Sequence, residues 1–244
     1  MTNTKGMTMP QIDDAELFGN AEDQRAYEEF CANQEAVEKF TLDKPALVCR
    51  WRMSNKKVPM LNRHIRALSE RLVQGEPLTH NMLSWAKQHV EWSLAEGDYT
   101  ARDGVLMLVI DVNGNAAMTV GEYEPLADTS AKALRARSAE ARSEADETGV
   151  APELLAAVNN GELAFVAPAD ECLCGTATLI EQLAQTKGIP VTRVDIPAQL
   201  KGALFLVSDE HGVVPATETD AAEADAATVA FFADGYEKLR ARRS

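Results

Sequence analysis

The stretch from residue 161 to residue 219 constrains the fold of this chain more than any other part, because several structural signals follow closely on one another. A tight turn at Gly175 opens an amphipathic helix whose apolar side chains fall on one face. Gly188 ends that helix, since a residue without Cβ readily takes a left-handed conformation. The pattern predicts a half-buried strand at residues 191–196 and a fully apolar strand at residues 203–207. The predicted order is strand, loop, helix, strand, short connection, strand and turn.

The start of the predicted helix is a candidate anion site. A helix N-terminus behind a glycine, beside the end of a buried strand, can hold a phosphate through backbone N–H groups. Gly175, Thr176 and Ala177 are therefore the expected cradle for such a group. Most helices that open after a glycine bind nothing, so this pattern alone leaves both readings open.

The charge of the chain limits the classes of molecule that it is expected to bind. The 244 residues carry a formal net charge of −14, which disfavours nucleic acid and anionic membrane surfaces. The longest apolar runs, at residues 105–110 and 203–207, have the length of strands and fall far short of a membrane span. The first residues lack the apolar core of a signal peptide, so a cytoplasmic location is expected.

The cysteines predict no metal site. Cys172 and Cys174 are separated by one residue, but no second cysteine pair or nearby histidine pair would complete a zinc site. The two cysteines are therefore expected to be packing residues.

Residues 41–124 predict a small α+β subdomain with an antiparallel sheet. Its sharpest signal is Asn113-Gly114, a hairpin turn between apolar segments. Arg63, His64 and Arg66 lie along the edges of one of its helices. The elements expected here are a strand at 45–53, helices at 62–73 and 77–95, and the hairpin strands at 104–111 and 116–123.

Residues 128–244 predict a larger α/β subdomain. After a linker at 125–129, residues 130–146 form a mostly exposed, charged helix that Gly149 ends. Lys132 lies at the start of this helix, where it is expected to face the junction of the two subdomains. A last helix is predicted at 221–243, and a helix at 21–39 within the extension 1–40 precedes both subdomains.

Taken in order, these elements resemble the class IV aminotransferases, a family that includes branched-chain and D-amino-acid aminotransferases and 4-amino-4-deoxychorismate lyase. The most specific likeness is GVVPATE at residues 212–218. The other similar stretches are RMSNKKVPMLNRH at 52–64, the Asn113-Gly114 hairpin, SAKAL at 130–134, residues 161–178, and GIPV at 188–191.

The resemblance implies a mixed α+β fold of two subdomains around a cleft, as in fold-type IV pyridoxal-phosphate enzymes. It implies pyridoxal 5′-phosphate as the cofactor and Lys132 as the lysine that forms a Schiff base with it. Gly175, Thr176, Ala177 and Arg66 would then bind the cofactor. It also implies a small-molecule ligand in the cleft between the subdomains and a homodimer.

Several departures from the family pattern fall on the chemistry. Ala67 stands where the family places the arginine that grips the cofactor phosphate, next to Arg66, and Thr178 replaces another arginine. Asp209 stands where a hydroxyl would bind the phosphate, and its carboxylate would repel that group. Near 148–154 the chain lacks the family segment that holds the glutamate for the ring nitrogen.

Two hypotheses follow. In the first, the chain is degenerate at the cofactor site and acts as a binding or non-catalytic homologue. In the second, it is an active pyridoxal-phosphate enzyme, an aminotransferase or an aminodeoxychorismate lyase-like enzyme, with Lys132 as its catalytic residue. The connection after Gly149 discriminates between them, because transamination needs an acid at the ring nitrogen.

Overall fold

The computed structural model describes residues 42–96, 99, 101–195, 200–218 and 220–241, together with Arg25 and Glu29. Residues 1–41 and 42–244 form two separate units, and the second is the one described below. The predicted extension 1–40 and its helix at 21–39 therefore lie outside the described residues, apart from those two positions. Among the described residues, no helix combines the length and apolar character that a membrane span requires.

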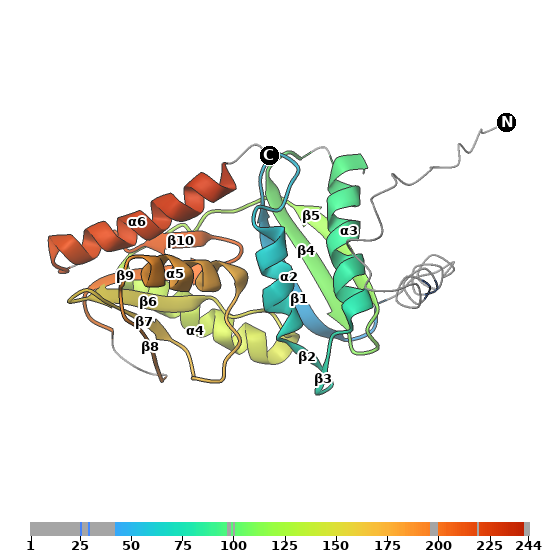
Figure 1. The fold of residues 1–244 in the computed structure, drawn as a ribbon, viewed down its shortest axis with the longest axis horizontal. Helices are drawn as coiled ribbons and strands as arrows, with labels where there is room; N and C mark the ends of the chain where they lie inside the picture. Colours follow the sequence, from blue (N-terminus) through green and yellow to red (C-terminus); the bar gives the residue numbers. More distant parts are fainter. Residues whose placement is uncertain are drawn as a thin grey trace. The chain divides into compact units, whose positions relative to one another are not determined.

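A three-stranded antiparallel sheet is built from the first half of this unit (Figure 1). Its order is β1 (Pro45–Met53), β4 (Gly104–Asp111) and β5 (Ala116–Gly121). The hairpin predicted at Asn113-Gly114 is confirmed, and buried Asp111 anchors it by accepting the backbone N–H groups of Asn113 and Asn115 at 2.9 and 2.8 Å. The helices that accompany this sheet are α2 (Leu61–Ser69) and α3 (His80–Glu96).

One predicted helix is shorter than expected. The pattern places a helix over 62–73, but α2 ends at Ser69, and Leu72–Val73 forms β2, which pairs with β3 (Glu76–Pro77). Gln74 and Gly75 both take positive φ, 53° and 84°, and so close a two-residue hairpin turn. Local turn chemistry overrides the apolar spacing that favoured a longer helix.

A five-stranded sheet is built from the second half, in the order β10-β9-β6-β7-β8. Its strands are β6 (Leu154–Asn159), β7 (Glu162–Val166), β8 (Val191–Val194), β9 (Ala203–Ser208) and β10 (Gly212–Pro215). Only the β7–β8 pair is parallel, and α5 (Gly175–Thr186) connects those two strands. The sequence does not predict the central strand β6, because LLAAVN is buried along almost its whole length and lacks polar alternation.

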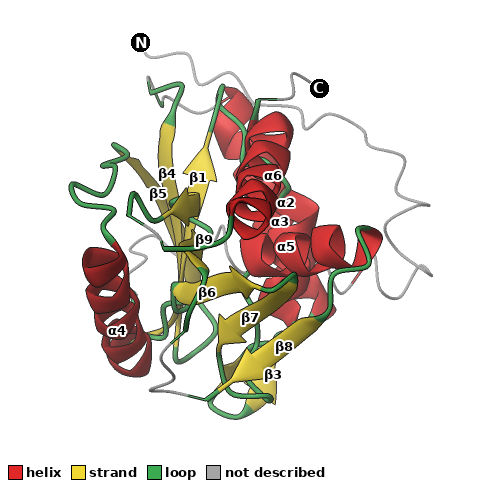
Figure 2. Cartoon of the chain, turned by 90° about the vertical axis from the view of Figure 1, so that its left-hand side faces the viewer, coloured by secondary structure: helices red, strands yellow, loops and turns green. Residues whose placement is uncertain are grey.

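Helices cover both faces of this sheet. Leu154, Ala156 and Val158 belong to one core with side chains of α5 and α6 (Glu223–Arg240). Leu155 and Ala157 point the other way, into a core with Leu134 of α4 (Ala131–Thr148). In Figure 2, α4 accordingly lies on one side of the strands, and α5 and α6 lie on the other.

Backbone contacts tie the two sheets together. The backbone N–H of Val48 in β1 donates to the carbonyl of Gly149 at 3.2 Å, and Val48 forms an isolated parallel bridge with Val150. The N–H of Arg52, farther along β1, donates to the carbonyl of Asp209 at 2.9 Å. The short connection after α4 and the β9–β10 turn therefore both lie against β1.

Candidate functional site

The first turn of α5 is capped by a carboxylate from a distant turn. Cys174 precedes the helix and provides no side-chain cap. Asp209, in the β9–β10 turn, accepts the backbone N–H of Gly175 at 3.2 Å and that of Thr176 at 2.7 Å. A negative charge at a helix N-terminus satisfies unpaired N–H groups and complements the macrodipole. The backbone N–H groups that are expected to hold an anion therefore donate to a carboxylate of the same chain.

The imidazole of His64, from α2, completes this contact. His64 is 3% exposed, and its Nδ1 lies 3.2 Å from Oδ2 of Asp209. Its ring stacks on Trp51 of β1, with centroids 5.4 Å apart and planes inclined by 20°. A Cβ at position 175 would overlap Nδ1 of His64, so the glycine there is required by packing and not by an unusual φ.

The electrostatics of this group favour an ionised Asp209. Burial raises the pKa of its carboxyl, but the electrostatic attraction to the imidazole of His64 and the hydrogen bond from the Thr176 backbone outweigh burial and lower the pKa from 3.8 to about 2. The side chain of Asp209 is only 9% exposed. Asp209 is therefore a buried carboxylate that is ionised at physiological pH.

A network of ion pairs fills the junction of the two sheets beside Asp209. Arg50 of β1 pairs with Glu144 of α4, and its NH1 lies 3.7 Å from Oε2 of Glu210 in the β9–β10 turn. Arg137 of α4 binds Glu153 through two bonds, from Nε at 3.1 Å and from NH2 at 2.8 Å. The residues come from four elements, so the network links both sheets to α4.

His211 continues this network toward Tyr123, which follows β5. Its Nε2 lies 3.8 Å from Oε1 of Glu153, and its Nδ1 lies 3.4 Å from the hydroxyl of Tyr123. Burial lowers the pKa of His211 from its usual value. The ligand atoms of Glu153, Glu210 and His211 lie within 4.8 Å of one another, but Arg137 already binds both oxygens of Glu153. These side chains therefore form an ion-pair cluster.

Little space remains at this junction. The cavity there has a volume of about 20 Å³, and its lining comes from β1, the connection before β6, the residue before α5, the end of β9 and the β9–β10 turn. The residues are Arg50, Val150, Ala151, Glu153, Cys174, Ser208, Asp209 and Glu210. A volume of this size holds about one water molecule, whereas small-molecule pockets typically measure roughly 300–1,000 Å³.

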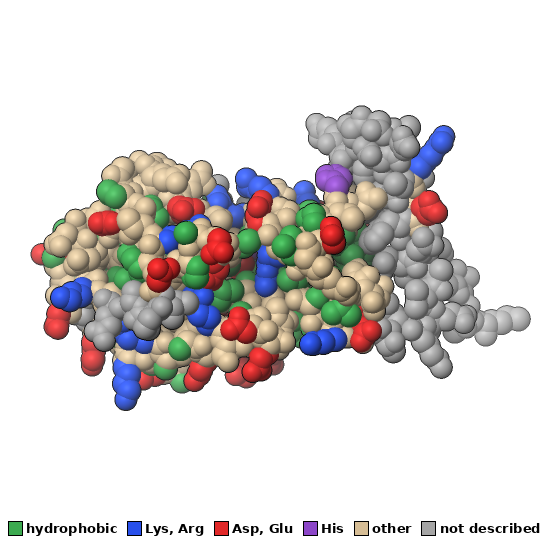
Figure 3. Space-filling view, turned by 90° about the horizontal axis from the view of Figure 1, so that it is seen from below, with side chains coloured by type: hydrophobic (Ala, Val, Ile, Leu, Met, Phe, Trp, Pro, Cys, Tyr) green, Lys and Arg blue, Asp and Glu red, His purple; other side chains and the backbone are tan. Residues whose placement is uncertain are grey.

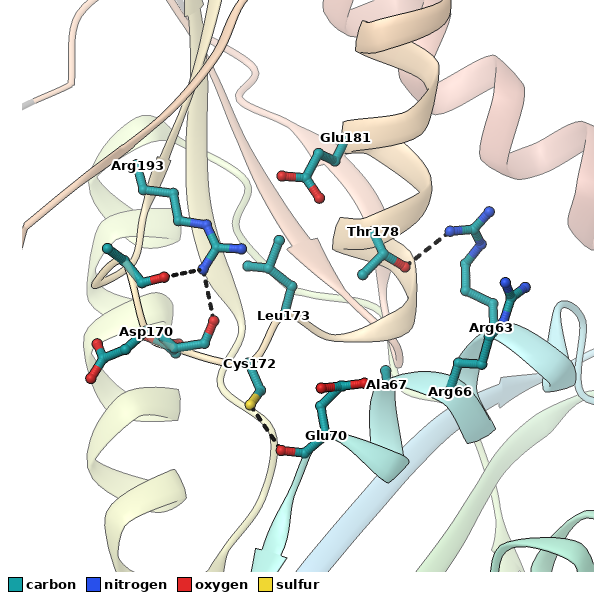
Figure 4. Close-up of a pocket in the computed structure, with 12 residues that line it drawn as sticks. Arg63, Arg66, Ala67, Glu70, Asp170, Cys172, Leu173, Thr178, Glu181 and Arg193 are labelled. Carbon is teal, nitrogen blue, oxygen red and sulfur yellow. Dashed lines mark hydrogen bonds between the residues drawn. The ribbon is translucent and has the colours of Figure 1, made fainter. Parts of the chain in front are cut away.

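A second, open pocket of about 450 Å³ lies between α2 and α5. Figure 4 shows Arg63 and Arg66 on one side of it, Arg193 on the opposite side, and Glu181 and Leu173 between them. Arg63 donates to the hydroxyl of Thr178 at 3.1 Å and so joins α2 to α5. Arg193 donates from NH1 to the carbonyls of Ala169 and Glu171 at 3.1 and 2.8 Å, which holds the loop before α5 in place.

The predicted site residues fall in three separate places. Gly175, Thr176 and Ala177 lie together at the start of α5, against Asp209 and His64. Arg66 is exposed at the open pocket, where its Nε donates to the carbonyl of Asn62 at 3.3 Å.

Lys132 is exposed in the first turn of α4. That helix packs on the face of the five-stranded sheet opposite to α5. Cys174 is buried beside the start of α5, and Cys172 is exposed and donates its S–H to the carbonyl of Glu70.

Three residues have roles that sequence reasoning does not find. The sequence suggests that Asp209 is a repulsive departure, although it is the cap of α5. His64 and Glu153 have no role that the sequence indicates, because each contacts a partner that is distant in the chain. An acidic residue in the turn just before GVVP is the one signal that points to the first of these contacts.

The residues present do not fit pyridoxal phosphate, the cofactor that the resemblance implies. The N–H groups expected to hold its phosphate already bind Asp209. The connection after Gly149 carries a single acid, Glu153, and Arg137 binds both of its oxygens. Lys132, the lysine of the resemblance, is exposed.

Known structures share the fold. No protein-family model and no curated protein matches the sequence. A candidate 4-amino-4-deoxychorismate lyase from Legionella pneumophila matches with a TM-score of 0.53 at 12% identity, over 83% of this chain and 97% of that one. A candidate branched-chain amino acid aminotransferase from Thermotoga maritima matches with a TM-score of 0.53 at 14% identity, over 84% and 92%.

A fold IV-transaminase from Curtobacterium pusillum is similar to the same degree, with a TM-score of 0.53 at 14% identity over 85% of this chain and 92% of that one. These identities are low, so the likeness concerns the fold. The chain therefore has the mixed α+β, fold-type IV architecture of the class IV aminotransferases, as its sequence predicts.

Proposed function

We propose that this chain is a non-catalytic protein with the fold of the class IV aminotransferases. The observation that carries the proposal is the filled junction, where ion-paired side chains leave about 20 Å³. Catalysis by a pyridoxal enzyme needs a phosphate anchor, an acid for the ring nitrogen and a lysine at the ring. Here Asp209 accepts the N–H groups that would anchor the phosphate. Arg137 binds both oxygens of Glu153, the acid that could serve the ring nitrogen.

A binding role is the function that remains for such a protein. The open pocket of about 450 Å³ lies between α2 of the first half and α5 of the second, and its size suits a small molecule. We assign the small-molecule ligand predicted for the cleft to this pocket. The net charge of −14, and the interspersed acidic and basic side chains on the face in Figure 3, do not favour nucleic acid. The homodimer and the cytoplasmic location remain predictions.

The test is an absorbance titration of the purified protein with pyridoxal 5′-phosphate. Wild type, Lys132→Ala and the matched control Lys201→Ala, another exposed lysine, are compared at the same concentrations. We expect the three proteins to give the same spectra, without the band of a specific Schiff base. A saturable band that disappears only in Lys132→Ala would overturn the proposal in favour of the active enzyme.

A further inference from the structure

The ion-pair cluster contains an imidazole nitrogen and a carboxylate that make no hydrogen bond. The side chain of His211 is 6% exposed, and among the described residues no hydrogen bond reaches its Nε2. That nitrogen lies 3.8 Å from Oε1 of Glu153, which is longer than a hydrogen bond. The carboxylate of Glu210, 19% exposed, also makes no hydrogen bond within the described part of the chain, and the guanidinium of Arg50 is 3.7 Å away. Polar groups this well buried normally have a partner.

The charges of the surrounding network favour a cation as that partner. Its carboxylates belong to Glu144, Glu153 and Glu210, and its guanidiniums belong to Arg50 and Arg137. One carboxylate of this partly buried network therefore has no guanidinium of its own, which costs free energy unless another cation pairs with it.

The donor set is that of a transition-metal site. Zinc in proteins takes histidine nitrogen and carboxylate oxygen at about 2.0–2.2 Å, and a site with three protein ligands leaves a position for water. The ligand atoms of Glu153, Glu210 and His211 lie within 4.8 Å of one another, so small side-chain movements would bring them onto one ion. The other ring nitrogen of His211, Nδ1, lies 3.4 Å from the hydroxyl of Tyr123, a contact that would orient the imidazole toward the ion.

The bonds from Arg137 to Glu153 leave room for an ion. A carboxylate carries about four lone-pair sites, and Arg137 uses one on each oxygen. Oε1 of Glu153 can therefore accept from Arg137 and also bind a metal ion on the side of His211. The cavity of about 20 Å³ is lined in part by Glu153 and Glu210, so it offers a place for one water molecule bound to the ion.

We infer that Glu153, Glu210 and His211 form a binding site for one divalent transition-metal ion such as zinc. The site joins the connection before β6 to the β9–β10 turn. It uses no cysteine and none of the residues expected to bind pyridoxal phosphate. The inference is independent of whether the protein catalyses a reaction.

The test is a calorimetric titration of the full chain with zinc chloride, after treatment with a chelator. The background is Cys172→Ala, because the exposed thiol of Cys172 could itself bind zinc. We expect one zinc ion per chain, bound in the micromolar range or more tightly. His211→Gln and Glu210→Gln in this background should each weaken zinc binding by roughly tenfold or more. Millimolar magnesium should not compete, because a histidine nitrogen suits zinc and not magnesium.

His80→Gln, at an exposed histidine of α3, is the matched control and should bind zinc like the background protein. Circular dichroism shows whether each variant is folded. Glu210→Gln keeps the test decisive if His211→Gln does not fold, because the Glu210 side chain makes no hydrogen bond among the described residues. The inference would be overturned by a background protein that binds no zinc, by unchanged binding in Glu210→Gln, or by displacement of zinc by magnesium. A Schiff-base band in wild type would overturn the proposed function alone and leave the zinc result to be decided separately.

Discussion

Asp209 and His64 are joined across the junction of the two halves, with Oδ2 of the carboxylate 3.2 Å from Nδ1 of the imidazole. The first residue belongs to the turn between β9 and β10, and the second belongs to α2. Since Asp209 also caps α5, one side chain connects three elements that are far apart in the sequence. The lowered pKa of Asp209 makes this contact one source of pH-dependent stability in the chain.

Asp209→Asn should lower the free energy of unfolding by about 2 kcal/mol at pH 7, since the pKa of this carboxyl falls from 3.8 to about 2 on folding. A lowered folded-state pKa gives stability that is complete above the unfolded pKa and is lost as the pH falls toward the folded one. The difference between wild type and variant should therefore be constant above about pH 5 and shrink toward pH 2. Urea unfolding across this range measures it, and a difference that does not depend on pH would contradict the assignment.

Arg137→Ala should destabilise the protein by about 3 kcal/mol, because it leaves the carboxylate of Glu153 buried without its guanidinium partner. Adding Glu153→Gln should recover part of the loss, since it removes the unpaired charge. Arg66→Ala, at an exposed arginine, is the matched control and should change stability by less than about 0.5 kcal/mol. Equal losses in the two arginine variants would show that the Arg137 pair is not a structural link.

Gly175→Ala should cost about 1–3 kcal/mol, because the added methyl group overlaps the ring of His64. The same change at Gly121, where no atom lies within 4 Å of the place that the methyl group would take, should be nearly neutral. Since His64 stacks on Trp51, the near-ultraviolet circular dichroism of the Gly175 variant should also change. If Gly175→Ala were as stable as Gly121→Ala, the result would contradict the close packing of His64 in α2 against Gly175 in α5.

Cys172 should react with a thiol reagent in the native protein, whereas Cys49 and Cys174 should react only after unfolding. Cys172 is exposed, and the other two are buried. Burial raises the pKa of Cys49 to about 12 and that of Cys174 well above 9.0, so neither forms the reactive thiolate. Reagent counting on wild type and Cys172→Ala measures this, with one rapidly labelled thiol lost in the variant. An unchanged rapid phase would contradict it.

Much of the fold could be predicted from local sequence, since the hairpin at Asn113-Gly114 and the helix opening at Gly175 have short-range signals. The central strand β6 could not, because a strand buried on both faces lacks the alternation that marks a strand. The contacts of the candidate site are still harder to predict from the sequence. The pairing of Asp209 with the start of α5 depends on two segments that only the folded sheet brings together, so its residues suggested repulsion where the structure has a cap.

Gly149, the left-handed residue that ends α4, has a consequence for how the chain unfolds. Its carbonyl accepts the N–H of Val48 and a bond from Arg71, and Val150 next to it bridges to β1. The backbone that follows α4 thus links the two sheets through main-chain hydrogen bonds. Neither half can open without breaking these bonds. The two halves should therefore behave as a single cooperative unit in hydrogen exchange, with the amide of Val48 exchanging only when both halves open together.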